Sequence, residues 1–128
     1  MKVCVVGAGG VGGLLAAVLR RKGVDVSLLV TERHVAPIRN NGLTVIGPDG
    51  RFTVQLPAET DPAAIGPVDV VVVTVKMWAV EALAPTLKPL LGNHFANTLF
   101  DRLKNFLHRN PIGYLLNFSL YAFLHDSI

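Results

Sequence analysis

The chain has few of the residues that build disulfide frameworks and metal sites. It contains one cysteine, Cys4, and four dispersed histidines, with no Cys-x-x-Cys pair in 128 residues. A single cysteine excludes an intramolecular disulfide framework and is typical of a reducing compartment. The histidines are too scattered for the ligand spacing of a zinc site, so we expect no metal.

Runs of like charge and a secretion signal are also missing. The net charge is +3 and the pI is near 9.4, but the twelve lysines and arginines are scattered, without the aromatic interleaving of a nucleic-acid surface. We therefore expect no nucleic-acid partner. The N-terminus has no basic region with a cleavage site, and glycines interrupt any signal-peptide core. These absences favour a cytoplasmic protein.

What the chain does contain, at its start, is an apolar strand that runs into a glycine-rich turn. Residues 3–6 have the composition of a central parallel strand, and a G-x-G-x-x-G pattern follows as Gly7, Gly9 and Gly12. Residues 14–22 then predict a helix closed by Gly23.

Each glycine of this pattern has a mechanical function. Gly7 permits the tight turn, Gly9 lets the backbone approach a pyrophosphate, and Gly12 lets the helix pack against the strand. The free N–H groups and positive dipole end of the helix then face the phosphates. The alternative, a merely flexible loop, is disfavoured because the pattern lies between a strand and a helix.

A second strand is predicted over residues 24–30, ending where a dinucleotide fold holds the adenosine ribose. A carboxylate after this strand would bond the ribose 2′-OH of NAD, whereas an arginine would accommodate the 2′-phosphate of NADP. The chain offers both, as Glu32 and Arg33, so the spacing leaves the choice open. Either residue taken singly is equally explained as part of a solvated loop.

The remainder, up to residue 91, alternates between strand and helix patterns. We predict a helix over 34–42, strands over 43–46 and 52–56, one helical turn after Asp61, a buried strand over 68–75, and a helical segment over 76–91. This alternation predicts an α/β fold with a doubly wound, Rossmann-like parallel sheet.

Lys76 directly follows the last buried strand. Ligands of such sheets bind beyond the carboxyl ends of the strands, so its ammonium could reach into the crevice. The alternative is a surface lysine at a helix start, where positive charge is unfavourable.

Four segments together resemble the N-terminal domain of the ketopantoate reductases (2-dehydropantoate 2-reductases). They are the glycine motif over 7–13, the Arg-x-x-Gly-x-x-Val spacing from Arg20, Ile-Arg-Asn-Asn-Gly-Leu-Thr-Val over 38–45, and Val-Thr-Val-Lys-Met-Trp over 73–78. The resemblance covers residues 1–91. It implies NADPH-dependent reduction of 2-dehydropantoate to pantoate in pantothenate biosynthesis, with Lys76 near the nicotinamide. It also implies that the pyrophosphate is held by Gly7, Ala8, Gly9, Gly10, Val11 and Gly12.

The chain departs from this family in one cofactor position. Many relatives carry an arginine directly after the second strand, where this chain has Thr31. Arg33 could substitute for it, with Thr31 offering a hydroxyl. We expect NADP(H) as the cofactor, with NAD(H) as the alternative.

Residues 92–128 do not match the family and hold seven of the nine aromatic residues. We expect helices here, broken at Pro111, that pack onto the bare edge of the sheet. The alternatives are attachment of residues 94–124 to a membrane surface or partner, and a frameshifted or spliced terminus. The apolar stretch 112–124 is too short for an ordinary transmembrane helix.

These observations give two functional hypotheses. The first is a truncated ketopantoate-reductase-like protein with a dinucleotide-binding domain at 1–91, limited to nucleotide binding and without a catalytic residue of its own. A 2-oxo acid would be its substrate only if another chain, such as the second copy in a homodimer, completed the site. The second is a non-catalytic, nucleotide-responsive module that docks to a partner or membrane through its tail.

Overall fold

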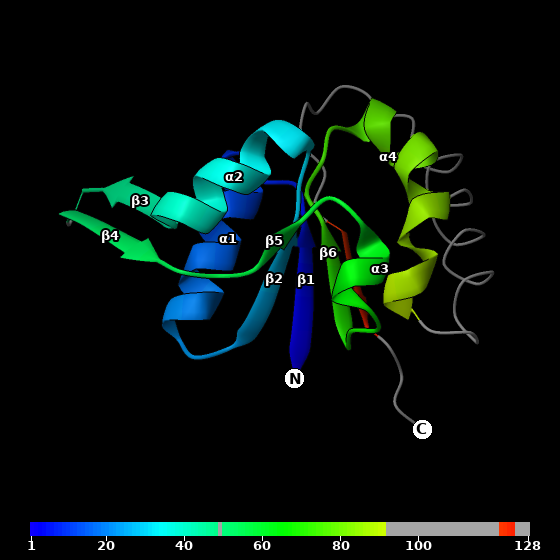
Figure 1. Cartoon of the computed structure of the whole chain (residues 1–128), viewed down its shortest axis with the longest axis horizontal. Helices are drawn as coiled ribbons and strands as arrows, with labels where there is room; N and C mark the ends of the chain where they lie inside the picture. Colours follow the sequence, from blue (N-terminus) through cyan, green and yellow to red (C-terminus); the bar gives the residue numbers. More distant parts are fainter. Residues whose placement is uncertain (49, 92–120, 125–128) are drawn as a thin grey trace.

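The computed structural model describes residues 1–48, 50–91 and 121–124 (Figure 1). The predictions made for residues 92–120 and 125–128 therefore lie outside the described part of the chain. In chain order the elements are β1 (Lys2–Val6), α1 (Gly10–Arg21), β2 (Asp25–Leu29), α2 (Glu32–Asn41), β3 (Leu43–Gly47), β4 (Gly50–Val54), β5 (Ala58–Glu59), α3 (Pro62–Ile65), β6 (Val70–Val73), α4 (Met77–Leu83), the 3₁₀ helix η1 (Ala84–Leu87) and β7 (Tyr121–Leu124).

The main sheet has the strand order β5-β2-β1-β6-β7. β1 lies at its centre, parallel to β2 with Val5 opposite Leu28, and parallel to β6 with Val5 opposite Val72. Val3 to Val6 are all buried, as expected of a strand covered on both faces. The α/β class and the Rossmann-like parallel arrangement predicted from the alternation of elements are confirmed.

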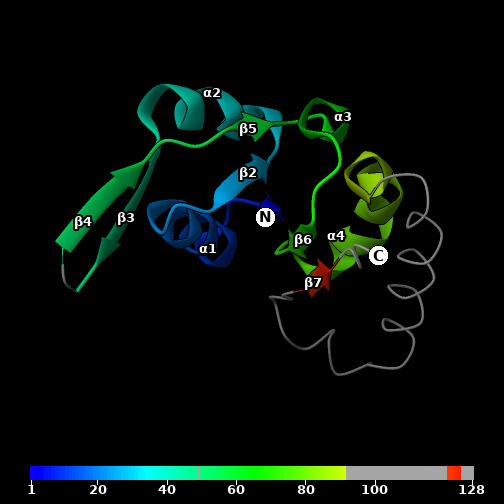
Figure 2. The same ribbon diagram turned by 90° about the horizontal axis from the view of Figure 1, so that it is seen from below.

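Side chains that alternate along the strands face two separate cores. On one face Val3 and Val5 pack with the α1 residue Ala16 and the α2 residue Ile38. On the other face Cys4 and Val6 pack with residues of α4, η1 and the segment that follows, including Leu87. Figures 1 and 2 show α1 and α4 on opposite sides of the sheet. Helices on both faces make the sheet doubly wound.

α1 begins earlier than the sequence indicated, at Gly10 rather than Leu14, so the last glycine of the motif lies inside the helix. The predicted closure at Gly23 is confirmed: Gly23 has φ +86°, and its amide donates to the Arg20 carbonyl at 3.0 Å. α2 likewise ends before Gly42, which has φ +74°. Both positions are in the left-handed region that favours glycine.

The predicted hairpin is confirmed as β3 and β4, which form a separate two-stranded sheet that projects from the body of the molecule (Figure 2). α1 holds it in place through two arginines. Arg20 Nε donates to the Gln55 carbonyl at 2.9 Å, and the Arg21 guanidinium lies 4.5 Å from the centre of the Phe52 ring.

The prediction of helix is wrong for the last described segment. Tyr121–Leu124 forms the strand β7, antiparallel to β6, with Val72 opposite Ala122. The strand nevertheless pairs with the sheet edge that we expected the tail to cover, because the free N–H and C=O groups of an edge strand favour pairing with a further strand. In the described parts of the chain, no helix combines the length and apolar character needed to cross a bilayer.

Candidate functional site

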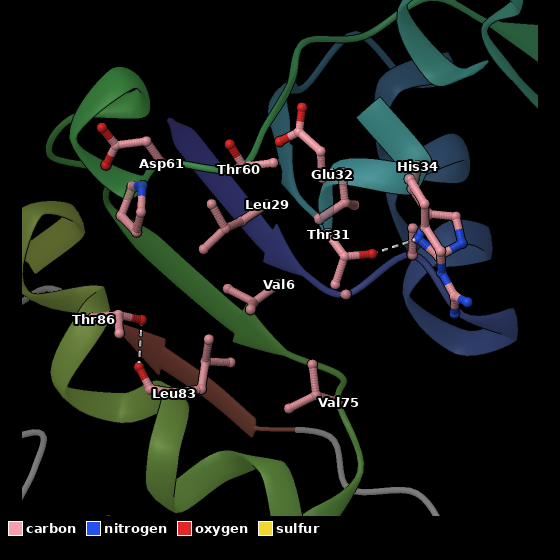
Figure 3. Close-up of a pocket in the computed structure, with 15 residues that line it drawn as sticks. Val6, Leu29, Thr31, Glu32, His34, Thr60, Asp61, Val75, Leu83 and Thr86 are labelled. Atoms are coloured by element: carbon pink, nitrogen blue, oxygen red, sulfur yellow. Dashed lines mark hydrogen bonds between the residues drawn. The ribbon is translucent and has the colours of Figure 1, made fainter. Parts of the chain in front are cut away.

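A cavity of about 770 Å³ lies beyond the carboxyl ends of β1 and β2. Its volume is in the range of small-molecule and cofactor pockets. Figure 3 shows Thr31 and Glu32 on one side of it, Leu83 and Thr86 on the other, and Val6 and Leu29 between them. The residues that line it are Val6, Gly7, Ala8, Leu29, Val30, Thr31, Glu32, Arg33, His34, Thr60, Asp61, Pro62, Val75, Leu83 and Thr86.

After Gly7, the glycine loop presents a row of backbone donors with no acceptor in the described part of the chain. The Gly7 amide donates to the Leu29 carbonyl at 2.9 Å, and the next amide along the chain that donates to a described carbonyl is that of Gly13, which donates to the Gly9 carbonyl at 2.8 Å. Within the described residues, the amides from Ala8 to Gly12 have no such acceptor. Free N–H groups at the start of a twelve-residue helix, with the positive end of its dipole, form a favourable environment for an anion.

The three glycines of the motif differ in the space around them. Gly7 has φ +104°, which a tight turn requires. A Cβ on Gly12 would overlap the Gly7 carbonyl oxygen and the Thr74 hydroxyl, whereas a Cβ on Gly9 would meet nothing within 4 Å. Gly12 is therefore needed for packing between helix and strand, while Gly9 leaves an open approach to the loop. The turn at Gly7 and the close packing at Gly12 agree with the expectation from the sequence, and the approach of a pyrophosphate to Gly9 stays a prediction.

The segment after β2 brings both candidate ribose-binding side chains to the same cavity. Glu32 and Arg33 are exposed and both line it, so the geometry keeps the choice between them open. Thr31 is the N-cap of α2, and its hydroxyl lies 3.0 Å from Nδ1 of His34. His34 was not predicted as a site residue, because its place depends on α2 starting at Glu32 rather than at His34.

Thr60 and Asp61 complete this end of the cavity and were also missed. Asp61 is the N-cap of α3, and its carboxylate accepts a hydrogen bond from the Ala63 amide at 3.0 Å. The Asp-Pro pair is a recognisable helix start. Its place in the same cavity as Gly7 depends on β5 pairing with β2, which a two-residue strand does not reveal in the sequence.

The remaining predicted residues lie outside this cavity. Gly9 and Gly10 line a second cavity of about 400 Å³, together with Leu14 and residues of β3. Val11 is 44% exposed on the first turn of α1. Lys76 is the exposed N-cap of α4, next to the cavity residue Val75, and its role near a nicotinamide stays a prediction.

The one cysteine is unsuited to nucleophilic chemistry. Cys4 is fully buried in β1, and this burial raises the pKa of its thiol to about 12. At neutral pH the group is a thiol rather than a reactive thiolate, so it contributes apolar packing to the core.

Comparisons with known proteins agree on one family. The family model described as "Ketopantoate reductase PanE/ApbA" matches residues 3–100. A 2-dehydropantoate 2-reductase from Halobacterium salinarum is 37% identical over 107 residues, which cover 82% of this chain and 35% of that protein. An uncharacterized oxidoreductase, YkpB, from Bacillus subtilis is 31% identical over 108 residues, or 84% of this chain and 35% of that protein.

Solved structures show the same similarity. The crystal structure of 2-dehydropantoate 2-reductase from Geobacter metallireducens aligns with a TM-score of 0.64 and 35% identity, covering 70% of this chain and 30% of that one. The present chain spans about a third of the length of the curated relatives that it matches.

Proposed function

This chain belongs to the ketopantoate reductase PanE/ApbA family, and from that premise we propose that residues 1–91 bind a nicotinamide dinucleotide, NADPH in preference to NADH. The activity that this binding would serve is the reduction of 2-dehydropantoate, which is the reaction named for several of its relatives. The proposal assigns a binding function to this chain and no catalytic residue.

The observation that carries the proposal is the set of amides from Ala8 to Gly12, which have no backbone acceptor among the residues that the structure describes. They lie at a helix start where Gly9 leaves open space, so a pyrophosphate can approach the backbone without meeting a side chain. Gly7 and Ala8 share one cavity with Thr31 and Arg33, which joins a phosphate-binding loop to a ribose-binding segment. The residues present therefore fit the cofactor.

A bound nicotinamide would supply hydride chemistry, and the chain would hold and orient the cofactor. Arg33 would attract the 2′-phosphate that distinguishes NADPH, and the Thr31 hydroxyl would offer a hydrogen bond beside it. Glu32 and Asp61 line the same cavity and would oppose a phosphate but accept a hydrogen bond from a ribose hydroxyl. The preference for NADPH thus requires Arg33 to outweigh the two carboxylates.

A thermal-shift titration of the purified chain, with NADPH and NADH in parallel, tests the proposal. A ligand at about 100 times its dissociation constant stabilises the folded state by about 2.7 kcal/mol, which gives a clear rise in Tm. We expect that rise with NADPH and a smaller one with NADH at equal concentration. A rise with NADH alone would replace Arg33 by Glu32 as the deciding residue, and no rise with either would contradict dinucleotide binding.

A further inference from the structure

We propose that Thr74 is a positioning residue for the glycine loop. Its hydroxyl holds the Gly7 carbonyl and so keeps the Ala8 amide turned towards an incoming dinucleotide. The identity of that ligand rests on the proposed function, whereas the effect of Thr74 on the loop does not.

Thr74 is the residue after β6, and it is a buried polar side chain, only 8% exposed. Its hydroxyl lies 2.9 Å from the Val6 carbonyl oxygen and 3.2 Å from the Gly7 carbonyl oxygen, 68 and 67 residues away in the chain. A hydroxyl next to these two oxygens is positioned to donate a shared hydrogen bond to them. The end of β6 is thereby tied to the start of the glycine loop.

The two bonds differ in importance. The Val6 carbonyl also accepts from the Thr74 backbone amide at 2.9 Å, so it keeps a partner without the hydroxyl. Within the described residues, the Gly7 carbonyl accepts from the hydroxyl alone. Removing the hydroxyl would therefore release the Gly7 carbonyl and little else.

The orientation of one peptide plane follows from this bond. The C=O of Gly7 and the N–H of Ala8 belong to one planar trans peptide, in which they point in opposite directions. Because the Gly7 carbonyl is directed at Thr74, the Ala8 amide is directed away from it. Ala8 lines the cavity, and its amide has no acceptor within the described residues.

Gly7 is fixed from both neighbouring strands. Its amide donates to the Leu29 carbonyl of β2 at 2.9 Å, and its carbonyl is held by Thr74 beyond β6. Because glycine has no Cβ, steric contacts alone do little to fix Gly7 at its φ of +104°. The two hydrogen bonds supply the restraint that the missing side chain does not.

The test compares Thr74→Val, which replaces the hydroxyl by a methyl of similar size, with Thr74→Ser, which keeps it. The control is Thr53→Val, the same exchange on the exposed strand β4, where it removes the 2.7 Å contact between the Thr44 and Thr53 hydroxyls. NADPH affinity is measured by calorimetry. Hydrogen exchange of the Gly7 and Gly13 amides is measured without ligand, with Leu28 in the core as internal reference.

We expect Thr74→Val to raise the Kd for NADPH about tenfold, equivalent to about 1.4 kcal/mol, and to speed exchange of Gly7 and Gly13 while Leu28 is unchanged. The Kd of Thr74→Ser for NADPH should stay within about threefold of the parent value. The Kd of Thr53→Val should equal that of the parent. If Thr74→Val keeps both NADPH affinity and amide protection, or if Thr74→Ser loses as much as Thr74→Val, the inference is overturned. If the parent binds no NADPH but Thr74→Val still loosens Gly7, the proposed function fails and the positioning role stands.

Discussion

Two segments that line the large cavity, the glycine loop and the segment that begins at Thr31, present different chemical groups. At the glycine loop the binding groups that we propose are backbone amides, which the glycines leave uncovered by side chains. At the other end the groups are side chains of Thr31, Glu32, Arg33 and His34. The glycine loop therefore depends on positions where a Cβ would be strained or would overlap other atoms, namely Gly7 and Gly12. The side-chain end depends on the balance between the charges of Glu32 and Arg33.

The largest effect we expect is at Gly12. A Cβ there would overlap the Gly7 carbonyl and the Thr74 hydroxyl, so Gly12→Ala must displace α1 from β1. Overpacking of this kind costs about 3 kcal/mol of the free energy of unfolding, measurable by urea denaturation. Gly10→Ala is the matched control, because its Cβ would meet nothing within 4 Å. Equal losses of stability in the two variants would contradict this explanation, because a Cβ on Gly10 has room and a Cβ on Gly12 does not.

Next in size is the change at Gly9, which separates binding from stability. Its backbone has φ −68° and ψ −173°, which alanine adopts freely, so we expect Gly9→Ala to unfold at the same urea concentration as the parent. The new methyl group would stand where a pyrophosphate approaches, and the Kd for NADPH should rise at least tenfold, by about 1.4 kcal/mol or more. Gly47→Ala, also in open space but on the hairpin, should leave the Kd unchanged. Unaltered affinity in Gly9→Ala would place the phosphates elsewhere.

A smaller effect, on selectivity rather than affinity alone, is expected at the side-chain end. Arg33→Ala should lower the ratio of NADPH to NADH affinity about tenfold, because it removes the cation facing a 2′-phosphate. Glu32→Ala should raise the same ratio, since it removes an opposing carboxylate. Both ratios are obtained from calorimetric titrations, with Arg51→Ala on the exposed hairpin as control. An unchanged ratio in Arg33→Ala together with a raised ratio in Glu32→Ala would show that Glu32 and the ribose hydroxyls decide the preference.

The smallest effect concerns the hydrogen bonds that join α2 to β5. Arg39 of α2 donates to the Ala58 carbonyl at 2.9 Å and to the Glu59 carboxylate at 2.6 Å, joining α2 to β5. The ion pair is exposed, 50% at Arg39 and 32% at Glu59, so Glu59→Gln should cost only about 0.5 kcal/mol by urea denaturation. Arg39→Ala also removes the bond to the backbone and should cost about 1 kcal/mol. A larger loss in Glu59→Gln than in Arg39→Ala would contradict this ordering.

The difference between the two ends also explains what the sequence could predict. Gly7 and Gly12 follow local rules of backbone geometry, so the turn at the first and the close packing at the second could be inferred from spacing alone. The places of Thr60, Asp61 and Thr74 depend on strand pairings between distant residues, such as β5 with β2 and β1 with β6. A threonine at the end of a buried strand gives no local sign that it bonds a carbonyl 67 residues earlier.

The same reasoning applies to the fold. The buried strands and the glycines closing α1 and α2 were predictable because their patterns are local. β5 has two residues, too few for a recognisable alternation, and β7 lies in a segment whose apolar residues fit a helix as well as a strand. The structure of such short segments is decided by pairing with a neighbouring strand, and that information is not contained in the segment itself.

The central place of β1 has a consequence for synthesis on the ribosome. β1 is made before both of its neighbours, and its partner on one side, β6, ends at Val73, 44 residues after the end of β2 at Leu29. At roughly 5–20 residues per second, the β6-facing edge of β1 would wait roughly 2–9 s for its partner while β2 and α1 are already available. The nascent chain would then carry an exposed apolar edge for seconds, a period in which a chaperone or a neighbouring nascent chain could bind it.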